Sequence, residues 1–118
     1  MNVLRLVANF ATPDPAALAD FYRRLLGLDL VMDHGWILTL ASPEAVRMRP
    51  QLSLASEGGS GTPVPDLSVE VDDVAEAHRR ALALAAEIVH PLTDEPWGVR
   101  RFFVRDPAGR VLNVLEHL

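Results

Sequence analysis

The 118-residue sequence contains neither cysteine nor lysine, so its eleven Lys+Arg residues are all arginines. Without these two residue types the chain can form no disulfide, zinc–thiolate site, cysteine nucleophile or Schiff-base lysine. It also lacks a run of about eighteen apolar residues, which a membrane-spanning helix needs. Arg5 and Asn9 interrupt the apolar start, which is too short for a secretory signal peptide with a cleavage site. We therefore expect a cytoplasmic globular protein.

Basic charge is scarce as well. Eleven arginines against sixteen carboxylates give a net charge of −5 and an isoelectric point near 5.2. Nucleic acids and anionic membranes require basic surfaces, so neither is an expected partner. The acidic balance would instead suit a cationic ligand. The length and the 49% apolar content are typical of a single domain that buries its own core.

The first half of the sequence predicts a strand, a helix and three further strands. Residues 3–11 form a nearly continuous apolar run, as in a buried strand. Asp14 followed by Pro15 is a typical helix start, and Gly27 is a typical helix end because glycine readily adopts the left-handed conformation. Short β-prone runs follow at 28–32, 36–41 and 51–55.

The second half repeats this order after a stretch rich in glycine, serine, threonine and proline. A strand is predicted at 66–71, then a helix capped by Asp72 or Asp73, and strands at 87–90, 101–105 and 111–115. The apolar positions predicted for one face of that helix are Val74, Ala77, Ala81, Leu84 and Ala85. The sequence thus predicts an α+β fold of two tandem βαβββ modules, 1–56 and 66–118, joined by a linker at 57–65.

Four segments in this order resemble a known superfamily. They are DFYRRLLGL at 20–28, VDDV at 71–74, PWGVRRFF at 96–103 and DPAGR at 106–110. Together they resemble the vicinal oxygen chelate superfamily, which holds glyoxalase I, extradiol dioxygenases and the bleomycin resistance proteins. The resemblance covers essentially the whole chain. It implies paired modules that curl around a cavity, usually in a homodimer.

The resemblance also implies positions for metal ligands on the first and last strands of each module. In this sequence those positions hold Val7, Ser53, Asp66 and Asn113. Only Asp66 would be an anionic ligand, whereas a divalent site wants three or four well-placed nitrogen or oxygen donors. We therefore expect no cofactor and no catalytic residue. The alternative is a lyase, isomerase or transferase in which Asp66 holds a divalent metal such as Mn, Ni, Zn or Fe.

A cavity without a catalyst predicts a binding protein. Trp36 and Trp97 offer flat rings for a planar ligand, although core packing is the alternative for both. Arg101 and Phe103 share one face of the 101–105 strand, and the sequence leaves open whether that face lines the cavity. An inward arginine would bind a carboxylate or phosphate; a solvated edge arginine is the alternative. The predicted ligand-binding residues are Trp36, Ser53, Asp66, His90, Trp97, Arg101, Phe103 and Asn113.

The leading functional hypothesis is therefore a metal-free, homodimeric protein that binds a small, aromatic or cationic molecule. The drug-sequestering antibiotic resistance proteins of the same superfamily would be its functional counterparts. A cavity-bearing interaction domain with no ligand of its own is a third interpretation.

Overall fold

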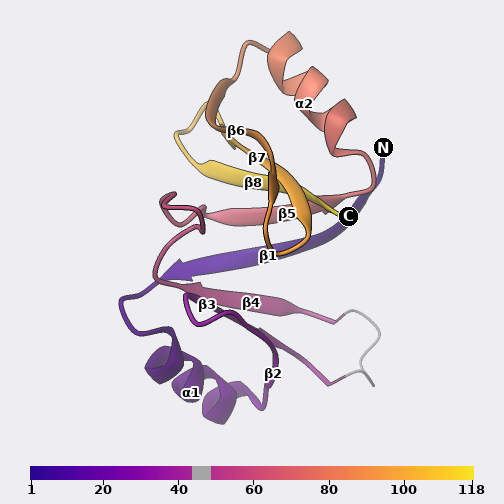
Figure 1. The fold of residues 1–118 in the computed structure, drawn as a ribbon. Helices are drawn as coiled ribbons and strands as arrows, with labels where there is room; N and C mark the ends of the chain where they lie inside the picture. The colour runs from indigo at the N-terminus through magenta and orange to yellow at the C-terminus, as the bar shows by residue number, and fades with distance from the viewer. Residues whose placement is uncertain (44–48) are drawn as a thin grey trace. The chain divides into compact units, whose positions relative to one another are not determined.

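A computed structural model gives the fold and describes residues 1–43 and 49–118. Its elements are β1 (Val3–Ala11), α1 (Pro15–Leu26), β2 (Asp29–Asp33), β3 (Ile37–Ala41), β4 (Gln51–Ala55), β5 (Leu67–Val71), α2 (Val74–Ala83), β6 (Glu87–Glu95), β7 (Val99–Arg105) and β8 (Val111–His117) (Figure 1). The predicted α+β fold is confirmed, and the order βαβββ occurs twice along the chain. The chain divides into two compact units, which we call the N-terminal unit (Val7–Val64) and the C-terminal unit (Met1–Leu6 with Pro65–Leu118).

The N-terminal unit holds β2, β3, β4 and the part of β1 that starts at Val7, in the order β2-β3-β4-β1. β1 and β4 are parallel, and the other two pairs are antiparallel. Helix α1 covers one face of this sheet, where Ala19, Leu38, Leu40 and Leu54 form the core. The helix has the predicted bounds because the Asp14 carboxylate accepts the Ala17 N–H at its start, while Gly27 ends it with a φ of 66°.

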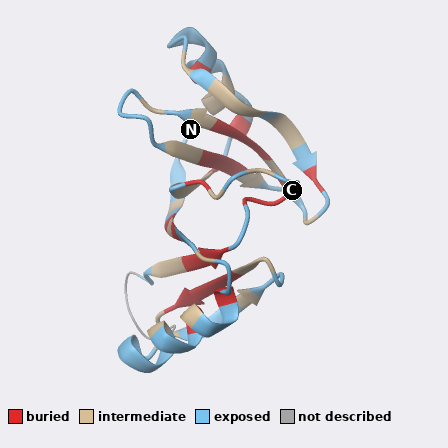
Figure 2. Cartoon of the chain, turned by 90° about the vertical axis from the view of Figure 1, so that its left-hand side faces the viewer, coloured by how far each residue is buried: buried red, intermediate tan, exposed pale blue. Residues whose placement is uncertain are grey.

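The C-terminal unit repeats the same pairing with the strand order β5-β8-β7-β6. β5 and β8 are parallel, and β8–β7 and β7–β6 are antiparallel. Helix α2 packs on one face, and the buried core beneath it consists of Val71, Val74, Ala81, Phe102 and Val114. Asp73 caps this helix by accepting the Glu76 N–H at 3.0 Å. Buried residues concentrate in the inner strands of each unit (Figure 2).

Several predicted boundaries in the C-terminal unit were wrong. β7 starts at Val99 and β8 ends at His117, each two residues beyond the predicted strand, and β6 and α2 differ as well. β6 continues past His90 and Pro91 to Glu95, because it is an edge strand whose register shifts on both sides of His90. An edge strand tolerates a proline, which has no N–H to offer a partner. Helix α2 ends at Ala83, before two of its predicted positions. Leu84 is 79% exposed and Ala85 has a left-handed φ of 54°.

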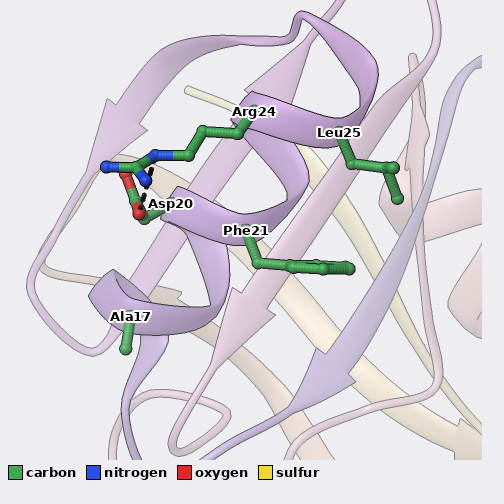
Figure 3. Close-up of a pocket in the computed structure, with 5 residues that line it drawn as sticks. All are labelled: Ala17, Asp20, Phe21, Arg24 and Leu25. Atoms are coloured by element: carbon green, nitrogen blue, oxygen red, sulfur yellow. Dashed lines mark ion pairs between the residues drawn. The ribbon is translucent and has the colours of Figure 1, made fainter.

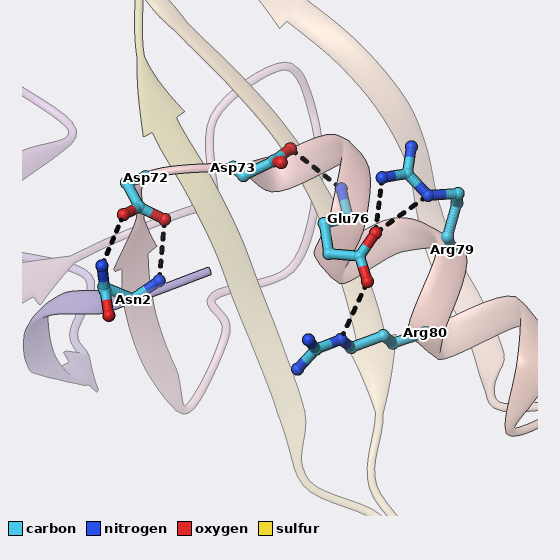
Figure 4. Close-up of polar contacts among 6 residues, drawn as sticks. All are labelled: Asn2, Asp72, Asp73, Glu76, Arg79 and Arg80. Carbon is cyan, nitrogen blue, oxygen red and sulfur yellow. Dashed lines mark hydrogen bonds and ion pairs between the residues drawn. The ribbon is translucent and has the colours of Figure 1, made fainter.

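Within the C-terminal unit, polar contacts hold the first residues of the chain beside the start of α2 (Figure 4). The Asn2 backbone N–H and its Nδ2 donate to the two carboxylate oxygens of Asp72, at 2.7 and 3.0 Å. These hydrogen bonds hold the pKa of Asp72 below its ordinary value. On α2, Glu76 pairs with the arginines three and four residues later, as its sequence spacing suggests.

Within the part of the chain that the structure describes, no helix combines the length and the apolarity that crossing a membrane requires.

Candidate functional site

A row of four side chains crosses the sheet of the C-terminal unit. Ser68 on β5, Asn113 on β8, Phe103 on β7 and His90 on β6 are successive cross-strand partners. Phe102, the neighbour of Phe103 in sequence, packs beneath α2. Since side chains alternate along a strand, this row occupies the sheet face opposite α2. We call it the Asn113 row.

The same alternation answers the question that the sequence left open for β7. Arg101 and Phe103 both lie on the face opposite α2, and their exposed fractions are 2% and 0%. Arg105, which follows them on that side, is an exposed residue that pairs with Glu87. Of the two arginines on this face, only Arg101 is therefore buried beside the row.

Arg101 lies between two aromatic rings. Its Cζ is 4.8 Å from the ring centroid of Trp97 and 4.7 Å from that of Phe103, which are cation–π distances. Its Nε is 3.4 Å from Oε1 of Glu95, so the buried cation has a buried counter-ion. Burial lowers the pKa of Arg101, and the charge of Glu95 opposes that shift.

Glu95 also contacts His90. The carboxylate Oε1 is 3.0 Å from His90 Nε2, and the histidine ring lies 5.4 Å from the Phe103 ring, centroid to centroid. Glu95 was not predicted, because the strand was expected to end at His90. The sequence signal for a longer strand was the turn-forming Pro96-Trp97-Gly98. In the structure this turn closes a hairpin, in which the Gly98 N–H donates to the Glu95 carbonyl and Glu95 faces Val99.

Asn113 has an incomplete set of hydrogen bonds. Its Nδ2 donates to Ser68 Oγ at 3.1 Å. Its Oδ1 is buried, and among the described residues it has no hydrogen-bond partner. A buried acceptor left unpaired costs about 1–3 kcal/mol. A bound molecule with an O–H or N–H group would remove that cost.

The N-terminal unit carries the corresponding row, with Ser53 at the position of Asn113. Asn9, Ser53 and Thr39 are successive partners on β1, β4 and β3. The hydroxyls of Ser53 and Thr39 are 2.7 Å apart, so Ser53 already has a polar partner. Trp36 lies just before β3, half-buried, with its ring stacked on His34 at 6.2 Å between centroids.

The predicted site residues are thus divided between the units. His90, Trp97, Arg101, Phe103 and Asn113 gather around one sheet face of the C-terminal unit. Asp66 belongs to the same unit, directly before β5, whereas Ser53 and Trp36 belong to the N-terminal unit. Their assignment as ligand-binding residues stays a prediction.

The residues at the implied ligand positions do not fit a divalent metal. Val7 has no donor atom, and Ser53 bonds to Thr39. The Asp66 carboxylate accepts the Val111 N–H at 2.8 Å, so it holds the start of β5 against β8. In the described part of the chain, no three histidine, aspartate or glutamate side chains gather closely enough to hold an ion.

The chain matches the model of a known family. The family model described as the Glyoxalase/Bleomycin resistance protein/Dioxygenase superfamily matches residues 5–114. No curated protein sequence matches the chain significantly.

Solved structures share the fold at low sequence identity. A Legionella pneumophila structure described as NAD-dependent benzaldehyde dehydrogenase has a TM-score of 0.76 and 18% identity, with 97% of this chain and 100% of that chain covered. A variant of methylmalonyl-CoA epimerase from Streptomyces coelicolor, in complex with 2-nitronate-propionyl-CoA, has a TM-score of 0.70 and 14% identity over 98% and 99% of the two chains. A superfamily member from Vibrio splendidus 12B01 has a TM-score of 0.66 and 18% identity over 98% and 99%.

Proposed function

Because the chain belongs to the glyoxalase/bleomycin resistance protein/dioxygenase superfamily, we propose that it binds a small organic molecule without a metal and without converting it. The ligand lies on the sheet face of the C-terminal unit, against the Asn113 row. The observation that carries this proposal is the buried Oδ1 of Asn113, which lacks a partner within the described chain. The ligand therefore carries an O–H or N–H donor for this oxygen.

The aromatic character of the ligand follows from the side chains around the row. Trp97 is half-buried at the β6–β7 turn and offers a large flat surface, whereas the ring of Phe103 in the row is fully buried. Aromatic faces favour planar, apolar molecules, and a few placed polar groups fix their orientation. Asn113 supplies such a polar group here.

The charge of the ligand follows from the Glu95–Arg101 pair. An unpaired buried arginine would favour a carboxylate or phosphate, but the charge of Arg101 is already balanced by Glu95 at 3.4 Å. The net charge of −5 further disfavours an anion. A neutral or cationic aromatic molecule fits best. The role of the protein would then be to sequester a drug of this kind in the cytoplasm.

A fluorescence titration tests the proposal. In Trp36→Phe, Trp97 is the remaining tryptophan reporter. We expect an anthracycline, a glycopeptide or a dicarbonyl compound to quench its emission, and a CoA thioester, which is polyanionic, to bind more weakly. If none of these classes changes the emission, the ligand-binding proposal is wrong and the interaction-domain interpretation is favoured.

A pair of substitutions at Asn113 locates the ligand in the same titration. Asn113→Leu removes the acceptor, so the dissociation constant should rise by about tenfold or more. Asn113→Asp keeps an acceptor and should retain binding. Glu116→Gln, on the same strand and outside the row, is the matched control. Equal affinity in all three variants would contradict a site at Asn113.

We extend the proposal to a homodimer, as the sequence resemblance implies.

A further inference from the structure

One carboxylate beside the Asn113 row is shared between an arginine and a histidine. Glu95 Oε1 lies 3.0 Å from His90 Nε2 and 3.4 Å from Arg101 Nε. The carboxylate is buried, and the His90 side chain is only 15% exposed. His90 belongs to the row, two strands away from Asn113, which corresponds to about 10 Å. We call Glu95, His90 and Arg101 the His90 cluster.

A second carboxylate on the same sheet face has the same two kinds of partner. Glu70 Oε1 lies 2.8 Å from His117 Nδ1, and Glu70 Oε2 lies 2.8 Å from Arg5 Nε. Glu70 is two residues after Ser68 on β5, and His117 is four residues after Asn113 on β8, so both lie on the face of the row. This His117 cluster is more open, because the histidine side chain is 55% exposed.

The charge of each cluster depends on its histidine. The ionised carboxylate balances the arginine, so each cluster is neutral while its imidazole is neutral and donates one N–H to the carboxylate. A second proton on the imidazole gives the cluster one positive charge. Histidine is the side chain that ordinarily changes charge between about pH 5 and 8. The face of the site therefore goes from balanced to positive as the pH falls.

Other ion pairs of the protein are of types that do not ordinarily change charge in this range. Arg105, beside the row on β7, pairs with Glu87, and the Asp66 carboxylate accepts a backbone N–H at the start of β5. On α1, Asp20 and Arg24 lie 3.1 Å apart beside a shallow hollow of about 400 Å³, and none of the described residues that line it is a histidine (Figure 3). The two shared carboxylates thus differ from these groups by their histidine partners.

We propose that the two clusters determine which ligand charge the site accepts, with His90 as the main specificity-determining residue. While the histidines are neutral, the face is balanced and a cationic aromatic molecule binds against the Asn113 row. Once they are protonated, the same molecule meets like charges and leaves, whereas a neutral molecule of the same shape stays bound. The site is that of the proposed function, on which this inference rests.

Distance and exposure set the size of the effect. One unit charge at about 10 Å, with an effective dielectric constant of about 20, changes a dissociation constant by about tenfold. His90 lies at about this distance from Asn113. His117 is about 14 Å from Asn113 along β8, and its greater exposure lets solvent and salt screen its charge. We therefore expect His90 to account for most of the dependence on pH.

Isothermal titration calorimetry with two probes of the same shape tests the inference. The 3-aminophenyltrimethylammonium ion is a permanent cation, 3-tert-butylaniline is its neutral isostere, and both carry an N–H donor for Asn113 Oδ1. Both should bind at pH 8. At pH 5.5 the dissociation constant of the cation should rise by about tenfold, and that of the neutral probe should not change.

Variants of single histidines locate the effect. His90→Gln keeps a donor for Glu95 and cannot become charged, so it should bind the cation at pH 5.5 nearly as well as at pH 8. His117→Gln should remove a smaller part of the pH dependence. His78→Gln is the matched control and should behave like wild type, because His78 lies on α2 with its ring 5.0 Å from that of Phe102, on the other face of the sheet.

Three results would overturn the inference. They are equal binding of the cation by the wild-type protein at both pH values, an unchanged pH dependence in His90→Gln, and no binding of the cation at pH 8. Binding of 3-tert-butylaniline in any of these cases would leave the proposed function intact. If neither probe binds and no compound quenches Trp97, the proposed function fails as well.

Discussion

Substitution of Glu95 by glutamine should destabilise the protein far more than its small change in shape suggests. The side chains of Glu95 and Arg101 are 2% and 3% exposed, and their charged atoms are 3.4 Å apart. Glu95→Gln keeps the size and an acceptor for His90 but removes the negative charge that lies beside the buried arginine. Removal of one partner from a buried pair typically costs 3–5 kcal/mol, so we expect a loss of about 3 kcal/mol. Domains are stable by only about 5–15 kcal/mol, so this loss is a large fraction of the total.

Urea unfolding followed by far-UV circular dichroism measures the effect, with the neighbouring residue as control. Asp94 pairs with Arg100 at 2.6 Å, but both side chains are exposed, at 55% and 42%. Asp94→Asn should therefore cost no more than about 1 kcal/mol. Replacement of both buried partners, Glu95→Met/Arg101→Met, should recover most of the loss, because no unpaired charge remains. If Glu95→Gln costs no more than Asp94→Asn, the buried pair contributes no more to stability than the exposed one, contrary to our expectation.

Three further predictions concern stability. Asp73→Ala removes the N-cap of α2 and should lower the free energy of unfolding by about 1 kcal/mol in urea unfolding, and an unchanged midpoint would contradict the capping role. Ala85→Gly should raise the thermal midpoint, because a left-handed φ of 54° costs alanine about 1 kcal/mol that glycine avoids; a lower midpoint would contradict this. Asp72 has a lowered pKa, so its contribution to the free energy of unfolding is complete above about pH 4 and is lost as the pH falls through its pKa in the folded protein. Asn2→Ala should make the free energy of unfolding, measured in urea at a series of pH values, fall less steeply with acid. An unchanged pH profile would count against this role of Asn2.

Local signals predicted most of the elements. The bounds of β1 and α1 follow from the apolar run at 3–11 and from the residues Asp14, Pro15 and Gly27, whose effects need only neighbouring backbone groups. The end of β6 could not be predicted in that way. Pro91 disfavours a strand locally, and only the edge position of β6 in the folded sheet makes the proline acceptable.

The candidate site was predictable as a set of residues but not as an arrangement. Alternation separated Arg101 and Phe103 from Phe102, yet both faces of β7 contain an arginine and a phenylalanine. Only the packing of Phe102 beneath α2 decides between them. The role of Glu95 depends on the same tertiary contacts, because no sequence pattern pairs it with Arg101 six residues later.

Metal-free binding of a small molecule at the Asn113 row can be measured with a chelator. The experiment is a titration of Trp36→Phe with a ligand that quenches Trp97, repeated in excess EDTA. We expect the same dissociation constant with and without the chelator. The contrary result would be that EDTA abolishes binding and that added Mn, Ni, Zn or Fe restores it with Asp66 present but not in Asp66→Asn. Asparagine keeps an oxygen that can accept the Val111 N–H, so failure to restore binding in this variant would report on the metal and not on the fold.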